Sequence, residues 1–199
     1  MSPGFAEQKE QLRQQIRQRL RTLSSEEKAE RSRLACALLV QQPVWQKARS
    51  ILFYAPLQDE PDLWPMVALA LQQAKEVALP RYVPEDQQYV ACRILSLDPP
   101  LPQGKFGILE PGPDCPLFPL NRLDLTLVPG LVFAVNGRRL GRGKGFYDRL
   151  LAQVSGTRCG VAFDEQFEAD LPWEPHDILL NCILTPTRWL RCDQSAVLK

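Results

Sequence analysis

The sequence predicts an α/β protein built on a mainly parallel sheet, and three observations support this fold class. Short apolar runs of the length of buried strands alternate with longer segments that have helical periodicity. The order strand, helix, strand recurs, and such units form parallel sheets with helices on both faces. A glycine-rich basic segment lies between a predicted strand and a predicted helix, where α/β proteins bind ligands. No repeat or linker divides the chain, so residues 1–199 are expected to form one domain.

Two helices are predicted at the start of the chain. Residues 6–22 carry an apolar stripe and a basic stripe, each with a spacing of four residues. The apolar stripe consists of Leu12, Ile16 and Leu20, and the basic stripe of Lys9, Arg13 and Arg17. From the residues alone, a solvated surface is the preferred interpretation of the basic stripe. The second helix begins at Ser24, which can form a capping box with Glu27, and it ends before Pro43.

The remaining elements follow the apolar runs. Strands are predicted at residues 50–55, 76–80, 90–97, 125–132, 158–163 and 178–184, and helices at 63–75 and 146–154. The apolar run 125–132 contains Pro129-Gly130, which is expected to end that strand. The segment 98–119 is rich in Pro and Gly and is expected to be an irregular loop, of a length that is often functional.

The charge and cysteine patterns argue against several classes of protein. Net charge is +1, so no global field favours nucleic acid or an anionic membrane, and no apolar run has the length of a membrane span. The six cysteines contain no Cys-x-x-Cys pair, and one histidine argues against a structural zinc site. Most cysteines lie in apolar runs and are expected to be small core residues. Because no signal peptide is recognised, we expect a cytoplasmic protein. We further expect a monomer that binds small molecules and has no nucleic-acid or membrane partner.

The segment most informative about function is 137–149, Gly-Arg-Arg-Leu-Gly-Arg-Gly-Lys-Gly-Phe-Tyr-Asp-Arg. Its glycines permit positive φ and leave backbone N–H groups uncovered, while Arg142 and Lys144 supply positive charge. A helix N-terminus directly after the loop would also favour an anion. The spacing matches neither a P-loop nor a dinucleotide fingerprint. It favours phosphate binding over the alternative, a flexible basic surface turn.

Together with the preceding Asp-Leu-Thr-Leu-Val-Pro-Gly-Leu-Val-Phe, this segment resembles the signature of 5-formyltetrahydrofolate cyclo-ligases, or methenyltetrahydrofolate synthetases. Shorter motifs of that family occur in the family's order. They are Lys9-x-x-x-Arg13, Pro56-x-x-x-Glu60, Leu79-Pro80-Arg81, Gly107-Ile108-x-Glu110-Pro111 and Pro175-His176-Asp177. The resemblance spans nearly the whole chain. It implies a three-layer α/β/α sandwich of the ribose-phosphate-isomerase and CoA-transferase type, in agreement with the element order.

The resemblance also implies a reaction and a set of site residues. The reaction is the ATP- and Mg²⁺-dependent cyclisation of 5-formyltetrahydrofolate to 5,10-methenyltetrahydrofolate, with release of ADP and phosphate. ATP would be bound by Lys9, Arg13 and Arg139 and by the loop residues Gly141, Arg142, Gly143, Lys144 and Gly145. The reduced folate would contact Leu57, Glu60 and Tyr147, and Mg²⁺ would be held by Asp148 and Asp177. Of these residues, Lys144, Arg142 and Tyr147 are expected to be catalytic.

Some positions depart from the family pattern, and other functions remain open from the residues alone. The departures are Leu63, Ala134, Phe146 and Asn181, and the first two are expected near the site. One alternative is a sugar-phosphate isomerase, or a CoA transferase with Glu60 or Glu110 as nucleophile. Another is a non-catalytic protein that binds nucleotide or folate. His176 is expected to have a structural hydrogen-bonding role rather than an acid–base role.

Overall fold

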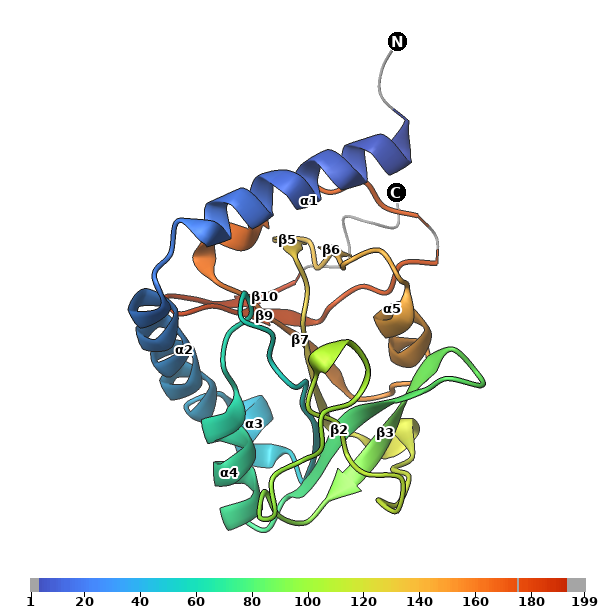
Figure 1. The fold of residues 1–199 in the computed structure, drawn as a ribbon. Coiled ribbons are helices and arrows are strands. Elements are labelled where there is room, and N and C mark those ends of the chain that lie inside the picture. Colours follow the sequence, from blue (N-terminus) through green and yellow to red (C-terminus); the bar gives the residue numbers. More distant parts are fainter. Residues whose placement is uncertain (1–3, 175, 193–199) are drawn as a thin grey trace.

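The computed structural model describes residues 4–174 and 176–192 and is organised around one large twisted sheet (Figure 1). The sheet has seven strands in the order β10-β9-β7-β4-β1-β2-β3. The central five run parallel to their neighbours, and the two edge strands, β3 and β10, pair antiparallel. In the order of the sheet, the strands span Trp189–Arg191, Cys182–Leu184, Thr157–Val161, Leu125–Val128, Ser50–Leu52, Glu76–Val83 and Gln88–Ile94. The predicted mainly parallel α/β architecture is confirmed.

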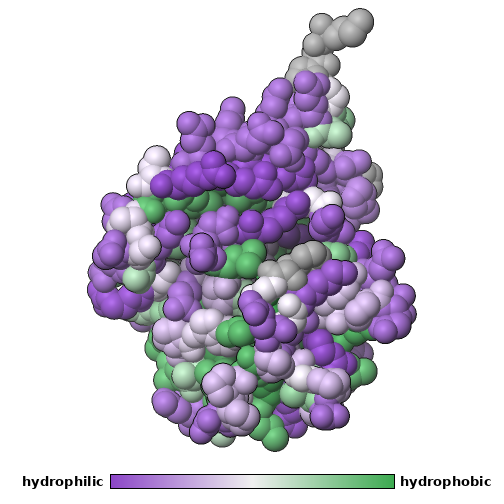
Figure 2. Space-filling view, viewed as in Figure 1, coloured by the Kyte–Doolittle hydropathy of each residue, from purple (hydrophilic) through white to green (hydrophobic). Residues whose placement is uncertain are grey.

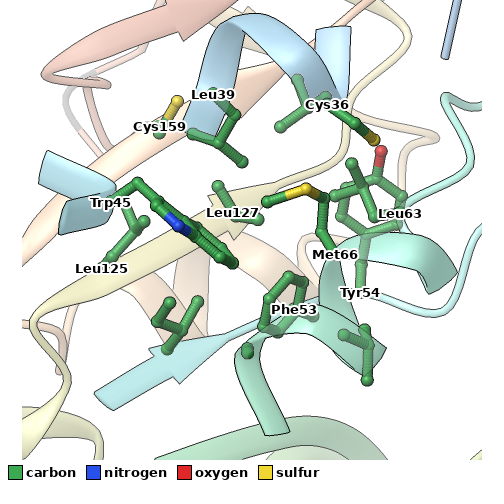
Figure 3. Packing of buried hydrophobic residues seen from close by; sticks show 14 of the residues in the cluster. Cys36, Leu39, Trp45, Phe53, Tyr54, Leu63, Met66, Leu125, Leu127 and Cys159 are labelled. Carbon is green, nitrogen blue, oxygen red and sulfur yellow. The ribbon is translucent and has the colours of Figure 1, made fainter. Parts of the chain in front are cut away.

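Helices cover both faces of this sheet, as the three-layer prediction requires. One face carries α2 (Ser25–Val40), α3 (Pro43–Lys47) and α4 (Trp64–Gln72), and the opposite face carries α5 (Phe146–Leu151) (Figure 1). Figure 3 shows the first of these interfaces. There Trp45 of α3 contacts Phe53 edge to face, with ring centroids 6.3 Å apart, beside Met66 of α4.

The predicted end of the strand at Pro129-Gly130 is confirmed, and beyond it the chain enters a second sheet that was not predicted. Strand β4 ends at Val128, and β5 (Val132–Ala134) belongs to a second, three-stranded sheet in the order β6-β5-β8. Its partners are β6 (Arg139–Leu140) and β8 (Phe167–Glu168). Pro129 has no N–H for a ladder hydrogen bond, and a Cβ at Gly130 would lie 2.6 Å from the Phe133 ring. The Pro-Gly pair therefore bends the chain into the smaller sheet.

Other differences concern the ends of elements. Strand β2 continues through Pro80 to Val83, since its pairing with β1 stops at Ala78 and only β3 lies beside it there. The predicted strand 178–184 begins only at Cys182, and the predicted helix 146–154 ends at Leu151. The short elements α3 and β10, together with the β5–β6–β8 sheet, were not predicted. Their few residues carry too little periodicity to be recognised.

Helix α1 (Phe5–Arg21) lies across the smaller sheet. The predicted apolar stripe is confirmed: Ile16 and Leu20 are fully buried against Val132 and Leu140, and Leu12 is partly buried there. The outward surface of α1 is hydrophilic, with hydrophobic atoms in the recess beneath it (Figure 2). At about 1.5–3 kcal/mol for each fully buried aliphatic side chain, this stripe anchors the helix.

Two further expectations can be compared with the structure. Ser24 and Glu27 form the predicted capping box at the start of α2. All six cysteines are free thiols, and Cys36, Cys92, Cys159 and Cys182 are buried as predicted. In the described part of the chain, none of the helices is both long and apolar enough to cross a membrane.

Candidate active site

A cavity of about 690 Å³ lies beneath α1 at the carboxyl ends of the parallel strands. Tyr54 and Ala55 follow β1 and Pro129 follows β4, so the cavity occupies the position at which open α/β sheets bind ligands. Every residue predicted from the sequence to contact nucleotide, folate or metal lines it. They are Lys9, Arg13, Leu57, Glu60, Arg139, Gly141, Arg142, Gly143, Lys144, Gly145, Tyr147, Asp148 and Asp177.

The glycine loop forms one wall of this cavity. Gly143 and Gly145 have φ values of +99° and +64°, the left-handed region in which glycine is favoured. The Arg13 side chain reaches the loop from α1, and its Nε donates to the Gly141 carbonyl at 3.0 Å. Lys144 is exposed on the loop. The loop is therefore built into a cavity and is no isolated surface turn, and Arg13 of the predicted basic stripe contributes to it.

Helix α5 follows the loop directly, with Gly145 as its N-cap, but it contains only six residues. A helix this short offers less dipole than the longer one predicted from the sequence. The capacity of the loop to bind an anion therefore depends mainly on its N–H groups and on its cations.

A cluster of three charged residues, here called the Lys9 cluster, stands at one side of the cavity. The Lys9 ammonium lies 2.7 Å from a Glu174 oxygen and 3.4 Å from an Asp177 oxygen. Its side chain is only 12% exposed. Burial alone would lower the pKa of Lys9, but the hydrogen bond that Lys9 donates to Glu174 and the nearby carboxylates more than offset this and raise it. The buried member of the cluster is thus a firmly protonated cation.

A second group, here called the Arg142 cluster, stands where the glycine loop meets the loop after β1. Arg142 Nη2 lies 2.5 Å from Asp59 Oδ1 and 3.1 Å from Glu60 Oε1. The other oxygen of Glu60 accepts the Leu57 N–H at 3.1 Å. The Glu60 side chain is 7% exposed, and burial raises its pKa, although Arg142 acts in the opposite direction.

Asp148 is the acid nearest to the glycine loop in sequence. Its Oδ1 accepts from Arg139 Nη2 at 2.7 Å, and the Arg139 side chain is 3% exposed. The described residues contain no group of three or more acids, cysteines or histidines that could hold a metal ion alone. Mg²⁺ usually binds one or two carboxylates together with water and substrate phosphates. Asp148 and Asp177 on the same cavity therefore fit a Mg²⁺ ion held mainly by a nucleotide.

Aromatic side chains form the remaining wall. Tyr89 and Phe146 line the cavity, and Tyr82 packs against both from outside the lining; the three rings meet edge to face, with centroids 5.3–5.5 Å apart. Tyr147 lies beside Tyr89, at 6.4 Å between centroids. Burial raises the pKa of Tyr147 well above its ordinary value, so its phenol stays protonated. This wall is suited to a flat, partly apolar ligand.

Some lining residues were not singled out from the sequence. Tyr89 and Glu174 carry no local signal, because the first reaches the cavity from edge strand β3 and the second from an irregular segment. Pro80, Ile108 and His176 also line the cavity, and their place in the short family motifs was the sequence signal that could have identified them. His176 is 70% exposed, and its Nε2 lies 3.6 Å from Asp177 Oδ1.

The four departures from the family pattern have different surroundings. Only Phe146 lines the cavity. Leu63 and Ala134, which were expected near the site, are fully buried in the core. The amide oxygen of Asn181 accepts the Arg158 N–H at 2.8 Å, between strands β7 and β9.

Comparison with known proteins agrees with this geometry. The chain matches the model of the 5-formyltetrahydrofolate cyclo-ligase family over residues 5–186. It is 30% identical over 184 residues to the 5-formyltetrahydrofolate cyclo-ligase of Mus musculus, covering 87% of this chain and 91% of the mouse protein. With the corresponding protein of Haemophilus influenzae it is 34% identical over 185 residues, covering 87% and 97%.

Solved structures show the same relationship. The fold matches that of Aquifex aeolicus 5,10-methenyltetrahydrofolate synthetase with a TM-score of 0.82 and 33% identity, over 92% of each chain. A 5,10-methenyltetrahydrofolate synthetase from Mycoplasma pneumoniae matches with a TM-score of 0.72 over 89% of this chain and 98% of that one. At 24% identity this second likeness concerns the fold alone. The matched region contains every segment that lines the cavity, from Lys9 to Asp177.

Proposed function

The chain belongs to the 5-formyltetrahydrofolate cyclo-ligase family, and from this premise we propose how its cavity performs the reaction. The reaction closes 5-formyltetrahydrofolate to 5,10-methenyltetrahydrofolate and converts ATP to ADP and phosphate. One observation carries the assignment: the glycine loop and the buried Glu60 carboxylate line the same cavity. A phosphate site and a site for a ligand with N–H donors are therefore adjacent.

In the first step, the γ-phosphoryl group of ATP passes to the formyl oxygen, and ADP leaves. Phosphoryl transfer needs positioning and charge stabilisation more than covalent assistance from the protein. The loop N–H groups from Gly141 to Gly145 would hold the phosphates, with Arg13 and Lys9 contributing from α1. Lys144 would neutralise the charge that develops on the transferring group, which supports its assignment as a catalytic residue.

Mg²⁺ would be held by Asp148 and Asp177 together with the nucleotide phosphates. When bound, the ion supplies charge neutralisation and orients the phosphates. Arg139 would fix the orientation of Asp148 through their 2.7 Å contact.

The folate would lie against the aromatic wall, with its pterin directed to Glu60. A buried carboxylate can accept hydrogen bonds from two ring N–H donors at once, and such charge-assisted bonds are strong. Leu57 would contact the same ring, since it lies beside Glu60 and lines the cavity. Tyr147, as a protonated phenol, would donate a hydrogen bond to the formyl oxygen or the incoming phosphate.

In the second step, the neighbouring folate nitrogen attacks the activated formyl carbon. The new C–N bond closes the five-membered ring, the nitrogen loses its proton, and phosphate departs with the former formyl oxygen. The chain's task in this step is to keep the two folate nitrogens and the carbon aligned and to limit water. Helix α1 covers the cavity, and this cover supports the exclusion of water.

The test is to incubate the protein with 5-formyltetrahydrofolate, ATP and Mg²⁺ and to measure ADP and the methenyl product in the same samples. We expect one ADP for each product molecule and little ADP without folate. ADP formation independent of folate, or product formation without ATP, would contradict the proposed chemistry.

We also propose that the protein acts as a monomer in the cytoplasm. All the residues proposed to bind ATP, Mg²⁺ and folate meet at one cavity within a single chain, which supports a site that works without a second copy. The six free thiols are suited to a reducing compartment. Sedimentation at working concentration tests the first statement, and cell fractionation tests the second.

A further inference from the structure

Arg142 is shared between two acids that differ in their surroundings. Asp59 is 29% exposed and lies outside the set of described residues that line the cavity, whereas Glu60 is 7% exposed and lines it. Arg142 Nη2 approaches both acids, and its Nε also lies 3.3 Å from Glu60 Oε1. Arg142 is thus paired with one acid that lines the cavity, Glu60, and with one that does not, Asp59.

The position of Arg142 on Glu60 hinders the proposed binding of both ligands, folate at Glu60 and nucleotide at the glycine loop. One Glu60 oxygen is engaged by Arg142 and the other by the Leu57 N–H, so a folate must displace or crowd the arginine to reach the carboxylate. Arg142 also belongs to the loop that faces the nucleotide phosphates. One guanidinium cannot remain on Glu60 and move to a triphosphate at the same time.

We propose that Asp59 is a positioning residue that holds Arg142 on Glu60 until a triphosphate takes the arginine, so that nucleotide and folate each promote binding of the other. The inference deepens the function proposed above and depends on the roles given there to Glu60 and the glycine loop. This coupling needs no direct attraction between the two ligands. They are coupled because each gains from the displacement of the same side chain.

The burial of Glu60 explains why an arginine is kept there. An unpaired carboxylate in this position would be poorly solvated, and burial already raises its pKa. Arg142 opposes that shift and favours the ionised form until the N–H donors of a folate replace it. The coupling is reciprocal, since an effector that changes the affinity for a ligand is itself affected by the same factor.

The effect of removing Asp59 follows from the same balance. Without its charge, Arg142 leaves Glu60 at lower cost, so each ligand alone should bind more tightly and the coupling should shrink. A purely structural role predicts the reverse for single ligands, because a distorted loop would bind both more weakly. The sign of the change therefore separates the two roles.

The experiment is calorimetric titration of 5-formyltetrahydrofolate with and without a saturating non-hydrolysable ATP analogue and Mg²⁺. For the wild type we expect folate affinity to rise about tenfold with nucleotide, within the range typical of allosteric coupling. In Asp59→Asn and Asp59→Ala the ratio should fall below about threefold, with each ligand alone binding more tightly. Asp59→Glu should restore most of the coupling. Asp170→Asn removes a charge from another Asp–Arg pair, at 2.7 Å from Arg138, and should keep the wild-type ratio.

The outcomes are distinguishable. An unchanged ratio in both Asp59 variants, weaker binding of both single ligands, or no coupling in the wild type overturns the role of Asp59. A thermal melt shows whether each variant is folded. If a variant is not folded, the wild-type titrations still show whether nucleotide and folate are coupled. Failure of the wild type to form the methenyl product would instead refute the proposed function.

Discussion

The two charged clusters around the cavity are built alike but bury charges of opposite sign. In the Lys9 cluster the most buried member is the cation, which is 12% exposed, beside Asp177 at 16% and Glu174 at 46%. In the Arg142 cluster the most buried member is an anion, Glu60, and the arginine is 34% exposed. Each cluster is a cation with two carboxylates. What differs is which charge is withdrawn from water.

That difference indicates which kind of ligand each cluster can accept. A buried charge needs a partner, and a ligand that supplies one can replace the partner already present. Lys9 would accept an anionic ligand in place of its acids, whereas Glu60 would accept N–H donors in place of Arg142. The proposed nucleotide and pterin sites thus differ in the sign of their most buried group.

The largest expected effect tests a cation that belongs to neither cluster. Lys144 is exposed and forms no ion pair within residues 4–174 and 176–192, so its charge remains available for the reacting phosphate. Lys144→Ala should lower kcat by about 10²–10³-fold, as for removal of one preorganised charge from a transition state. Steady-state kinetics beside a thermal melt measure this, with Lys47→Ala on α3 as the exposed-lysine control. Near-normal turnover in Lys144→Ala would remove the glycine loop from the mechanism.

The second prediction compares the clusters directly. Glu60→Gln should weaken folate binding by roughly 10²-fold, since truncating one partner of a buried charge pair costs about 2–5 kcal/mol. Nucleotide affinity should be unchanged or higher, because Arg142 is released. Lys9→Ala should weaken the nucleotide and spare the folate. Titration of each variant with each ligand tests the pair, and equal losses for both ligands in either variant would mean that the cluster supports the fold only.

The third prediction concerns Asp148, which is proposed as a Mg²⁺ ligand. Asp148→Asn replaces a charged oxygen ligand by a neutral one, so the Mg²⁺ concentration needed for half-maximal activity should rise by on the order of tenfold. High Mg²⁺ should restore part of the activity. Nucleotide titrations at several Mg²⁺ concentrations give a readout independent of turnover. An Mg²⁺ dependence equal to that of the wild type would exclude Asp148 as a ligand.

The smallest expected effect is a pH dependence of folate binding that comes from Glu60 in the Arg142 cluster. Burial raises the pKa of Glu60, so on acidification this carboxylate is protonated earlier than an ordinary glutamate and loses its ability to accept two N–H donors. Folate affinity should therefore fall as the pH decreases through this raised pKa. Glu60→Gln supplies the control, because its residual binding should be nearly independent of pH over the same range. A wild-type profile as flat as that of Glu60→Gln would show that Glu60 is not the titrating group.

Much of the site follows from local sequence, since its residues lie in short motifs. The alternation of glycines with Arg142 and Lys144 predicts a phosphate loop, and Gly143 and Gly145 take the left-handed conformation that such a loop can use. Roles taken from the family resemblance remain proposals for this chain. Their shared placement around one cavity is what the structure adds.

The parts that escaped prediction depend on contacts between distant segments. The break at Pro129-Gly130 could be predicted, but the second sheet beyond it could not, because that sheet depends on how Phe133 packs beside Gly130 and on how β5 pairs with β6 and β8. Tyr89 and Glu174 reach the cavity through the pairing of β3 and the path of an irregular segment. The role proposed for Asp59 requires knowing that Arg142, 83 residues away, lies against it.

The anchoring of α1 has a consequence for the order in which parts of the molecule open. Its apolar contacts run from Leu12, near the middle of the helix, to Leu20 near its end, whereas Lys9 is held by ion pairs and Phe5 is 60% exposed. Local unfolding should therefore begin at the first turns of α1 and stop near Ile16. In hydrogen exchange, amides before Lys9 should exchange rapidly and those around Ile16 and Leu20 slowly, and a bound nucleotide should protect the first group. The same fraying would give the substrates a route to the cavity without any movement of the sheet.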